Sequence, residues 1–329
     1  MTHHDSVDEA VQRIRAGSVR AMARGLSWIE SGGQLAEALT DALYPFSGAA
    51  HVVGITGSPG SGKSTLTSAL TRVIRAAGAS VGIVAVDPSS PFSGGSILGD
   101  RIRMAEIGSD PGVFIRSMAT RGALGGLCAA ARDAVDLLDV AGKDIVIVET
   151  VGVGQDEVDI MRLAHTTLVV SVPGLGDDIQ AMKAGIIEIA DIHVINKADR
   201  EGADRTAADI RNVLALGHSS TMWEPPVLSC VAPTGAGVGA LHGQITAHAT
   251  HLKTTGEWQA RERRLAESRV LKIAQQLVAD GLKRPLDGDR ALLADALARV
   301  MARELSPLRC ARTLLSQVSD RERTVHVRS

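Results

Sequence analysis

Aromatic side chains are nearly missing from this chain of 329 residues, which has three Phe, three Trp and one Tyr. So few rings cannot form a platform on which the bases of single-stranded nucleic acid stack. An excess of charge of one sign is missing too, because 35 basic residues are balanced by 37 acidic ones. Without a broad positive field, the chain is not expected to hold a nucleic-acid backbone.

Cysteine is scarce as well: Cys128, Cys230 and Cys310 lie far apart, and no Cys-x-x-Cys pair occurs. This argues against a disulfide framework and against a zinc site built from neighbouring residues. No apolar run approaches the ~18 residues of a membrane span. The polar, acidic start of the chain lacks the pattern of a secretory signal. We therefore expect a cytoplasmic protein with no membrane partner.

Short aliphatic runs alternate with helical stretches between residues 49 and 255. Several runs are apolar at consecutive positions, which is typical of strands buried on both faces of a parallel sheet. The predicted fold class is therefore α/β, with a mostly parallel, doubly wound sheet whose ligand sites lie at the carboxyl ends of the strands. The predicted strands are 51–55, 81–86, 113–115, 145–148, 167–171, 192–195 and 227–228.

Helical sequence flanks this region on both sides. Helical spacing of apolar residues in 1–48 predicts an N-terminal extension of two or more helices that ends before Pro45. Residues 256–329 are also helical, with an Arg-rich first helix from Trp258 to Leu282 and two more after Pro285. A long apolar stripe needs a surface to cover, and a twofold copy is the commonest one. Residues 256–329 are therefore predicted to be the dimerisation region of a homodimer.

A phosphate-binding loop follows the first predicted strand. The segment 57–65 contains a complete G-x-x-x-x-G-K-[ST] pattern and precedes a helix-compatible stretch, Leu66 to Ala77. Its glycines let successive N–H groups point at phosphate oxygens, and the helix amino terminus adds positive charge. Lys63 is predicted to neutralise the β- and γ-phosphates, and Ser64 to offer its hydroxyl to Mg²⁺. The residues of the predicted phosphate-binding loop are Gly57, Ser58, Pro59, Gly60, Ser61, Gly62, Lys63, Ser64 and Thr65.

The segment 196–199, Asn-Lys-Ala-Asp, ends the sixth predicted strand and indicates the base. A carboxylate only accepts hydrogen bonds, so Asp199 can take the N1–H and amine protons of guanine, whereas adenine would face it with an acceptor. Asn196 would hold the loops together, and the stem of Lys197 would cover the ring. Ser229, Cys230 and Val231, after the last strand, are placed to offer backbone N–H groups to the guanine carbonyl. The predicted ligands are therefore GTP and GDP.

Further motifs occur in 86–91, 94–104, 121–126 and 149–155. Together with the phosphate loop and the 196–199 segment, they resemble the MeaB/ArgK-like P-loop GTPases. These are accessory G-proteins of adenosylcobalamin-dependent acyl-CoA mutases such as methylmalonyl-CoA mutase. The resemblance is dense over residues 50–235. It implies a homodimer joined through C-terminal helices, and a GTPase that gates cofactor loading and protects the partner mutase.

The resemblance also assigns acidic residues to the Mg²⁺ shell and to catalysis. Carboxylates beside a triphosphate would repel it unless a cation lay between them. Asp87 and Glu149 close the second and fourth predicted strands, beside the phosphate loop. Asp100 also fits an ordinary turn-capping residue of a glycine-rich loop. The implied magnesium ligands are Ser64, Asp87, Asp100 and Glu149, and the implied catalytic residues are Lys63, Asp100 and Glu149.

Two departures from common GTPases affect the expected mechanism. Glu149 stands where most GTPases have Asp, as in this family, and no Gln directly follows Gly152 to orient the attacking water. Slow intrinsic hydrolysis that a partner stimulates is therefore expected, with Gln155 as a nearby candidate. The resemblance makes 172–183 a partner-sensing switch, although its sequence also fits a turn followed by a helix cap. The switch candidates are Gln155, Asp177, Asp178 and Lys183. Residues 116–122 and Arg101 suggest a subgroup of this family that is distinct from the best-known partner of methylmalonyl-CoA mutase, so the identity of the mutase is open.

Three other functions fit parts of the sequence. A transport-system kinase or ATPase would use the phosphate loop, but the 196–199 segment disfavours ATP. A metallochaperone GTPase for nickel-enzyme maturation would have a His-rich tract or a Cys/His cluster, and the ten histidines are scattered. An adaptor switched by nucleotide with negligible turnover differs from an enzyme in degree, and a partner-stimulated turnover assay separates the two.

Overall fold

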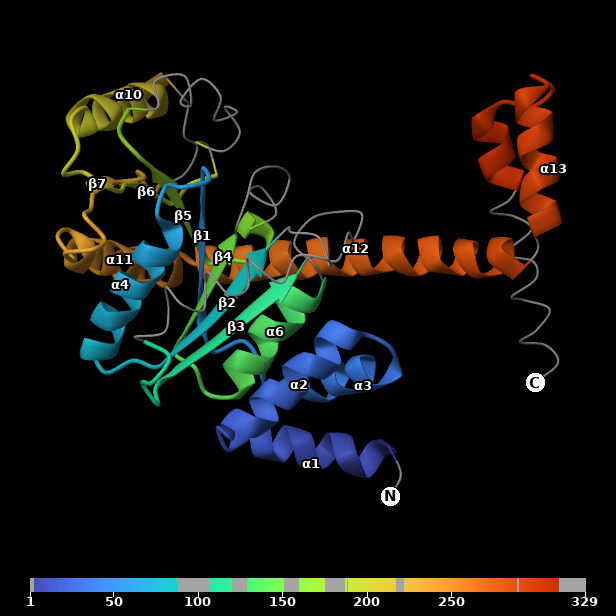
Figure 1. The fold of residues 1–329 in the computed structure, drawn as a ribbon, viewed down its shortest axis with the longest axis horizontal. Helices are drawn as coiled ribbons and strands as arrows, with labels where there is room; N and C mark the ends of the chain where they lie inside the picture. Colours follow the sequence, from blue (N-terminus) through green and yellow to red (C-terminus); the bar gives the residue numbers. More distant parts are fainter. Residues whose placement is uncertain are drawn as a thin grey trace. The chain divides into compact units, whose positions relative to one another are not determined.

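The computed structural model describes residues 3–87, 107–119, 129–150, 160–174, 187, 189–216, 222–288 and 290–313. By its internal contacts the chain divides into two compact units, Met1–Glu262 and Arg263–Ser329. The helices are α1 (His3–Arg15), α2 (Val19–Ser31), α3 (Gln34–Leu43), η1 (Tyr44–Phe46), α4 (Lys63–Ala76), α6 (Ala129–Val140), η2 (Ile160–Arg162), α10 (Ala203–Leu216), α11 (Val238–Thr255), α12 (Glu257–Gly288) and α13 (Arg290–Met301). The strands are β1 (His51–Gly57), β2 (Val81–Asp87), β3 (Val113–Ala119), β4 (Ile145–Thr150), β5 (Thr166–Ser171), β6 (Ile192–Ile195) and β7 (Val227–Ser229) (Figure 1).

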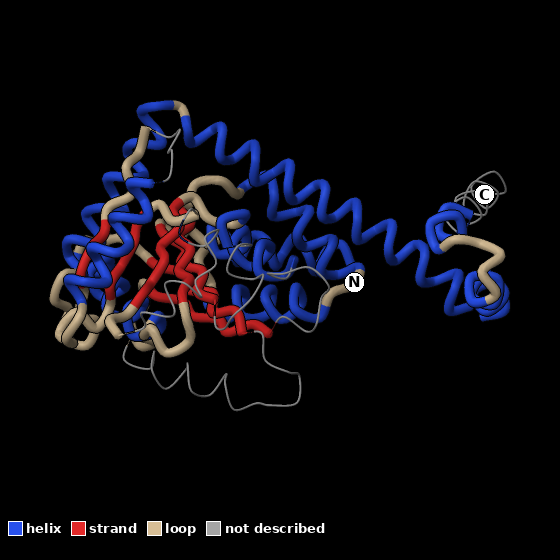
Figure 2. Tube along the Cα trace, turned by 90° about the horizontal axis from the view of Figure 1, so that it is seen from above, coloured by secondary structure: helices blue, strands red, loops and turns tan. Residues whose placement is uncertain are grey.

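The described strands form one sheet in the order β3-β2-β4-β1-β5-β6-β7, and every neighbouring pair is parallel. Each run predicted as a strand lies in one of them, and helices flank the sheet on both faces (Figure 2). The predicted α/β fold class is therefore confirmed. The chain moves outward from β1 to β3 and then returns through β4 to the other side of β1. The strand order thus changes direction beside β1, where sheets of this type bind ligands at the carboxyl ends of their strands.

The two faces of the sheet are covered by different helices. Successive strand residues point to opposite faces, so Val52 packs with α1, α2, α3 and α6, whereas Val53 packs with α4 and α11. Both residues are buried, as are their neighbours on β4. This two-sided burial explains why the strands are apolar at consecutive positions.

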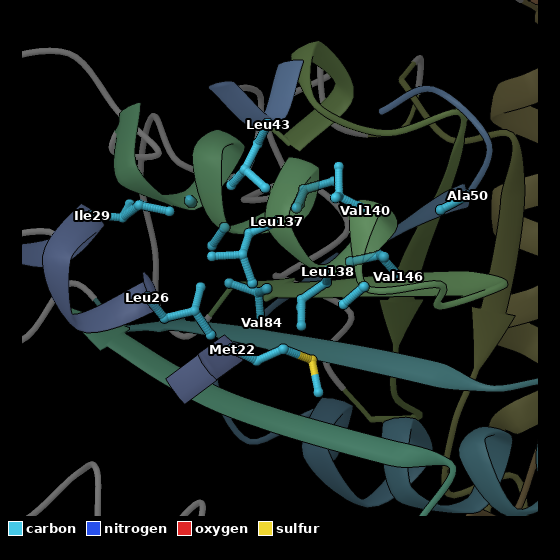
Figure 3. Close-up of a cluster of buried hydrophobic side chains, with 14 of the residues drawn as sticks. Met22, Leu26, Ile29, Leu43, Ala50, Val84, Leu137, Leu138, Val140 and Val146 are labelled. Atoms are coloured by element: carbon cyan, nitrogen blue, oxygen red, sulfur yellow. The ribbon is translucent and has the colours of Figure 1, made fainter. Parts of the chain in front are cut away.

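The N-terminal helices form part of the core of the first unit. Met22 and Leu26 of α2 and Leu43 of α3 surround Leu137 and Leu138 of α6 (Figure 3). Each is 1% exposed or less, and complete burial of such a side chain contributes roughly 1.5–3 kcal/mol. These helices therefore stabilise the face of the sheet that α6 covers.

Two helix boundaries differ from the sequence-based expectation. The helix after β1 begins at Lys63, three residues before the predicted Leu66, because Gly62 adopts a left-handed conformation that lets the chain turn directly into the helix. The long helix α12 continues past Pro285 as far as Gly288. Among the helices of the described ranges, none has both the length and the apolar composition for crossing a membrane.

Candidate functional site

The predicted phosphate loop lies between the carboxyl end of β1 and the start of α4. Gly60 and Gly62 have φ angles of 75° and 85°, a left-handed conformation that favours glycine. No side chain caps the amino terminus of α4, where Gly62 is the N-cap residue. The first amides of α4 can therefore donate to an anion, which the helix dipole also favours. Pro59 and Gly60 are exposed at the tip of the loop.

The ammonium group of Lys63 is held against the loop that precedes it. Its Nζ atom donates to the carbonyl oxygens of Gly57, at 2.6 Å, and Ser58, at 3.0 Å. The residue is only 7% exposed, so its positive charge has a fixed position inside the curve of the loop. A phosphate chain bound by the loop amides would lie within reach of this charge.

Glu149, at the end of β4, is hydrogen-bonded to two side chains in the first turns of α4. The Ser64 hydroxyl donates to Glu149 Oε1 at 2.6 Å, and the Thr67 hydroxyl donates to Oε2 at 2.9 Å. The carboxylate is buried, and its backbone is fixed between β1 and β2, opposite Ile55 and Ala85. Hydroxyl and carboxylate oxygens are the hard ligands that Mg²⁺ prefers. The pair formed by Ser64 and Glu149 therefore fits the predicted magnesium site.

Asn196 connects the predicted base loop to the phosphate loop. Its Nδ2 atom donates to the carbonyl oxygens of Ser61, at 2.8 Å, and Gly62, at 3.4 Å. Its Oδ1 atom accepts from the backbone N–H of Ala232 at 3.2 Å. Asn196 is 1% exposed, so one buried amide joins three segments. The sequence-based role of this residue, to hold the loops together, agrees with these contacts.

Lys197 and Asp199 lie in the turn that follows β6. Lys197 has a φ angle of 56°, and its Nζ atom donates to the carbonyl oxygen of Gly60 at 2.7 Å. The turn closes with a hydrogen bond from the Arg200 amide to the Lys197 carbonyl at 3.0 Å. Asp199 is exposed in this turn. Its carboxylate thus stands on a loop that is hydrogen-bonded to the phosphate loop at two points.

The segment after β7 is packed against the same turn. The Ala198 amide donates to the Cys230 carbonyl at 3.0 Å. The amides of Cys230 and Val231 donate to the carbonyl oxygens of Ile195, at 2.8 Å, and Ala236, at 2.9 Å. Both amides thus have acceptors within the chain. Hydrogen bonds from the backbone amides of Ser229, Cys230 and Val231 to a guanine carbonyl stay a prediction. Burial raises the pKa of the Cys230 thiol to about 11, which keeps it neutral near pH 7.

Several predicted site residues lie wholly or partly outside the part of the chain that the structure describes. Asp87 ends β2, the neighbour of β4, but its side chain is outside the described residues. The others that lie entirely outside them are Asp100, Gln155, Asp177, Asp178 and Lys183.

Thr67 and the Ala232 amide belong to the site but were not among the residues predicted from the sequence. Thr67 follows Ser64 by three positions, which places the two side chains on one face of α4. That spacing is the signal that could have identified Thr67. A backbone amide such as that of Ala232 carries no side-chain signal at all.

Comparisons with known proteins show the family to which the chain belongs. Residues 22–285 match the family described as "Methylmalonyl Co-A mutase-associated GTPase MeaB". The GTPase ArgK of Escherichia coli is 35% identical over an alignment that covers 97% of this chain and 98% of that relative. The mitochondrial methylmalonic aciduria type A homolog of Mus musculus is 33% identical over 274 residues, 82% of this chain and 66% of that relative.

A solved structure shares the fold. The crystal structure of a protein titled LAO/AO transport system kinase superposes with a TM-score of 0.73 at 27% identity, and the match covers 98% of this chain and 99% of that one. A Pyrococcus horikoshii relative that is named as a GTPase is 44% identical over 320 residues, 96% of this chain and 99% of its own. The family match spans most of the chain, and the phosphate loop and the hydrogen bonds of Asn196 fit a GTPase site. The chain therefore belongs to the MeaB family of methylmalonyl-CoA mutase-associated GTPases.

Proposed function

We propose that this MeaB-family GTPase is a Mg²⁺-dependent G-protein chaperone of an adenosylcobalamin-dependent acyl-CoA mutase, and that it gates cofactor loading and protects the mutase. The nucleotide part of the proposal rests on the hydrogen bonds by which Asn196 and Lys197 join the base loop to the phosphate loop. The mutase part is supported by the family description, which names methylmalonyl-CoA mutase.

The described residues support direct attack of water on the γ-phosphoryl group, without a covalent intermediate. The amides of the loop and the Lys63 ammonium would stabilise the phosphate charge. Ser64 and Glu149 would hold the metal shell, and Mg²⁺ bound there would supply further positive charge to the β- and γ-phosphates. Because no Gln directly follows Gly152, the intrinsic rate is proposed to be slow and to rise on contact with the partner.

Base specificity can be tested by calorimetry with the full-length chain and Mg²⁺. The Asp199→Asn variant should bind GTP more weakly and favour xanthosine triphosphate, because the amide donates where the carboxylate accepted. Lys63→Ala should lose nucleotide binding or turnover. Equal binding of ATP and GTP by the unaltered chain would instead support the transport-kinase alternative, and unchanged GTP affinity in Asp199→Asn would contradict the guanine assignment.

The mutase role can be tested with purified adenosylcobalamin-dependent acyl-CoA mutases of different substrate specificity. One of them should bind the chain in the presence of a non-hydrolysable GTP analogue and should accelerate GTP hydrolysis. The Asp199→Asn variant serves as a matched control, because its response to the same mutase should require xanthosine triphosphate. Absence of binding and of stimulation with every such mutase would contradict the chaperone proposal.

A homodimer through α12 is supported by an exposed apolar stripe on this helix. Five side chains between 270 and 278 are 44–67% exposed, and they recur at helical spacing. They are Val270, Leu271, Ile273, Leu277 and Val278. Light scattering should give twice the monomer mass for the full chain and the monomer mass for Leu277→Glu. Val19→Glu, at a site 62% exposed on α2, should leave the dimer intact, and a monomeric full chain would contradict the proposal.

A further inference from the structure

Thr67 has a contact that the sequence-based account of the site does not use. Its hydroxyl donates to Glu149 Oε2 at 2.9 Å, while the Ser64 hydroxyl donates to the other carboxylate oxygen at 2.6 Å. Thr67 is completely buried and lies one turn after Ser64 on α4. Each oxygen of Glu149 is thus bonded to a hydroxyl of the same helix.

The backbone that carries Glu149 has little freedom of its own. Glu149 is paired with Ile55 of β1 on one side and with Ala85 of β2 on the other. The next residue, Thr150, donates through its hydroxyl to the Thr56 hydroxyl at 3.1 Å, just before the phosphate loop. The remaining freedom of Glu149 lies in its side-chain torsions, which the two hydroxyl contacts restrict.

The contact between Ser64 and Glu149 is compatible with metal binding by Ser64. A hydroxyl has one donor and two lone pairs, so Ser64 can donate its proton to Oε1 while its lone pairs face a cation. The direction of those lone pairs then depends on where Oε1 lies. Because the carboxylate is rigid and planar, a bond that fixes Oε2 also fixes Oε1.

We infer that Thr67 is a positioning residue for the magnesium site: through Glu149 it sets the orientation in which Ser64 meets Mg²⁺. This inference rests on the proposed function, because it presumes that the loop binds a Mg²⁺–nucleotide complex. Removal of the Thr67 hydroxyl deprives Oε2 of a donor in a buried site, which is costly. The carboxylate then gains rotational freedom, and Ser64 loses its fixed acceptor. Groups that orient metal ligands typically change metal affinity 10–100-fold when they are mutated.

The chain offers a matched set of variants for the test. Thr67→Val removes the hydroxyl and keeps the shape of the side chain, and Thr67→Ser keeps the hydroxyl. Thr71→Val removes another buried hydroxyl of α4, one that donates to the Thr67 carbonyl at 2.7 Å. Thr67→Ala is a second hydroxyl-free variant in case Thr67→Val does not fold.

The measurement is the release rate of a fluorescent GDP analogue over a range of Mg²⁺ concentrations and in EDTA. Thr67→Val should need about tenfold more Mg²⁺ for half-maximal slowing of release, with release in EDTA changed less than about twofold. Thr67→Ser and Thr71→Val should behave as the unaltered chain. Mn²⁺ binding to the GDP complex, followed by electron paramagnetic resonance, should weaken in parallel.

Two kinds of failure can be told apart. An unaltered Mg²⁺ dependence of release in both hydroxyl-free variants overturns the inference. An equal rise in the required Mg²⁺ concentration in Thr71→Val also overturns it, and so does a release rate in EDTA that changes as much as the Mg²⁺ dependence. An unaltered chain that binds no guanosine nucleotide overturns the proposed function, and the inference with it.

Discussion

The side-chain amide of Asn196 lies 2.8 Å from the carbonyl oxygen of Ser61, although 135 positions separate the two residues in the sequence. Ser61 belongs to the phosphate loop, and Asn196 opens the loop that carries Asp199. A contact within the chain therefore holds the two loops in register, which lowers the entropy cost of binding both ends of a nucleotide.

Replacement of Asn196 by Ala should weaken GDP binding about tenfold. The substitution leaves the Ser61 carbonyl and the Ala232 amide without their partner, and an unsatisfied buried group costs roughly 1–3 kcal/mol. Calorimetry with GDP measures the effect. Thr234→Ala removes an exposed hydrogen bond to the Val231 carbonyl and should change the affinity less than about twofold. An Asn196→Ala variant with full affinity would show that the bridge has no part in binding.

Gly62 and Gly60 should differ sharply in their tolerance of Ala. Both have positive φ angles, so both substitutions cost about 1 kcal/mol of backbone strain. Only at Gly62 would the added Cβ also clash, since it would lie 2.5 Å from Asn196 Nδ2, whereas the space beside Gly60 is open. In a filter-binding assay, the nucleotide affinity of Gly62→Ala should therefore be lower than that of Gly60→Ala by about tenfold or more. Equal losses would refute the clash.

The free energy of unfolding should fall as the pH drops from 7 toward 5. Burial lowers the pKa of His51 to about 3 and the pKa values of His193 and His248 to about 4, from an unfolded value of 6.5. Below pH 6.5 the unfolded chain therefore binds protons that the folded chain refuses, and each group removes up to about 1.4 kcal/mol per pH unit. Urea unfolding at several pH values measures the slope. His248→Gln should reduce that slope by the contribution of one proton. A free energy of unfolding that does not change with pH would contradict the prediction.

Arg261 should matter far more for stability than an exposed arginine. Its guanidinium makes two hydrogen bonds to the Asp191 carboxylate, at 2.8 and 2.9 Å, and the two side chains are 22% and 12% exposed. Arg261→Leu would leave Asp191 without this partner, which costs roughly 3–5 kcal/mol for a buried pair. Arg13→Leu breaks a pair with Glu9 in which both side chains are more than half exposed, and should cost about 1 kcal/mol or less. Chemical denaturation compares the two variants, and similar losses would rule out the burial argument.

The strands and the phosphate loop could be predicted from the sequence because their signals are local. A run such as 145–148 is apolar at every position, and that pattern is typical of a strand covered on both faces. The loop 57–65 combines its glycines, Lys63 and Ser64 within nine positions, so its chemistry needs no distant partner to be recognised. The 196–199 segment was informative for the same reason.

Contacts between distant segments could not be predicted in this way. Thr67 and Glu149 are separated by 82 positions, and they meet only because β4 is inserted between β2 and β1. The same holds for Arg261 and Asp191, which the start of α12 brings to the amino end of β6. Local patterns in the sequence thus indicate which segments are strands and which residue types can hold a nucleotide. Which side chains orient those nucleotide-binding residues follows only from the folded chain, because it depends on strand order and on the packing of α4 against the sheet.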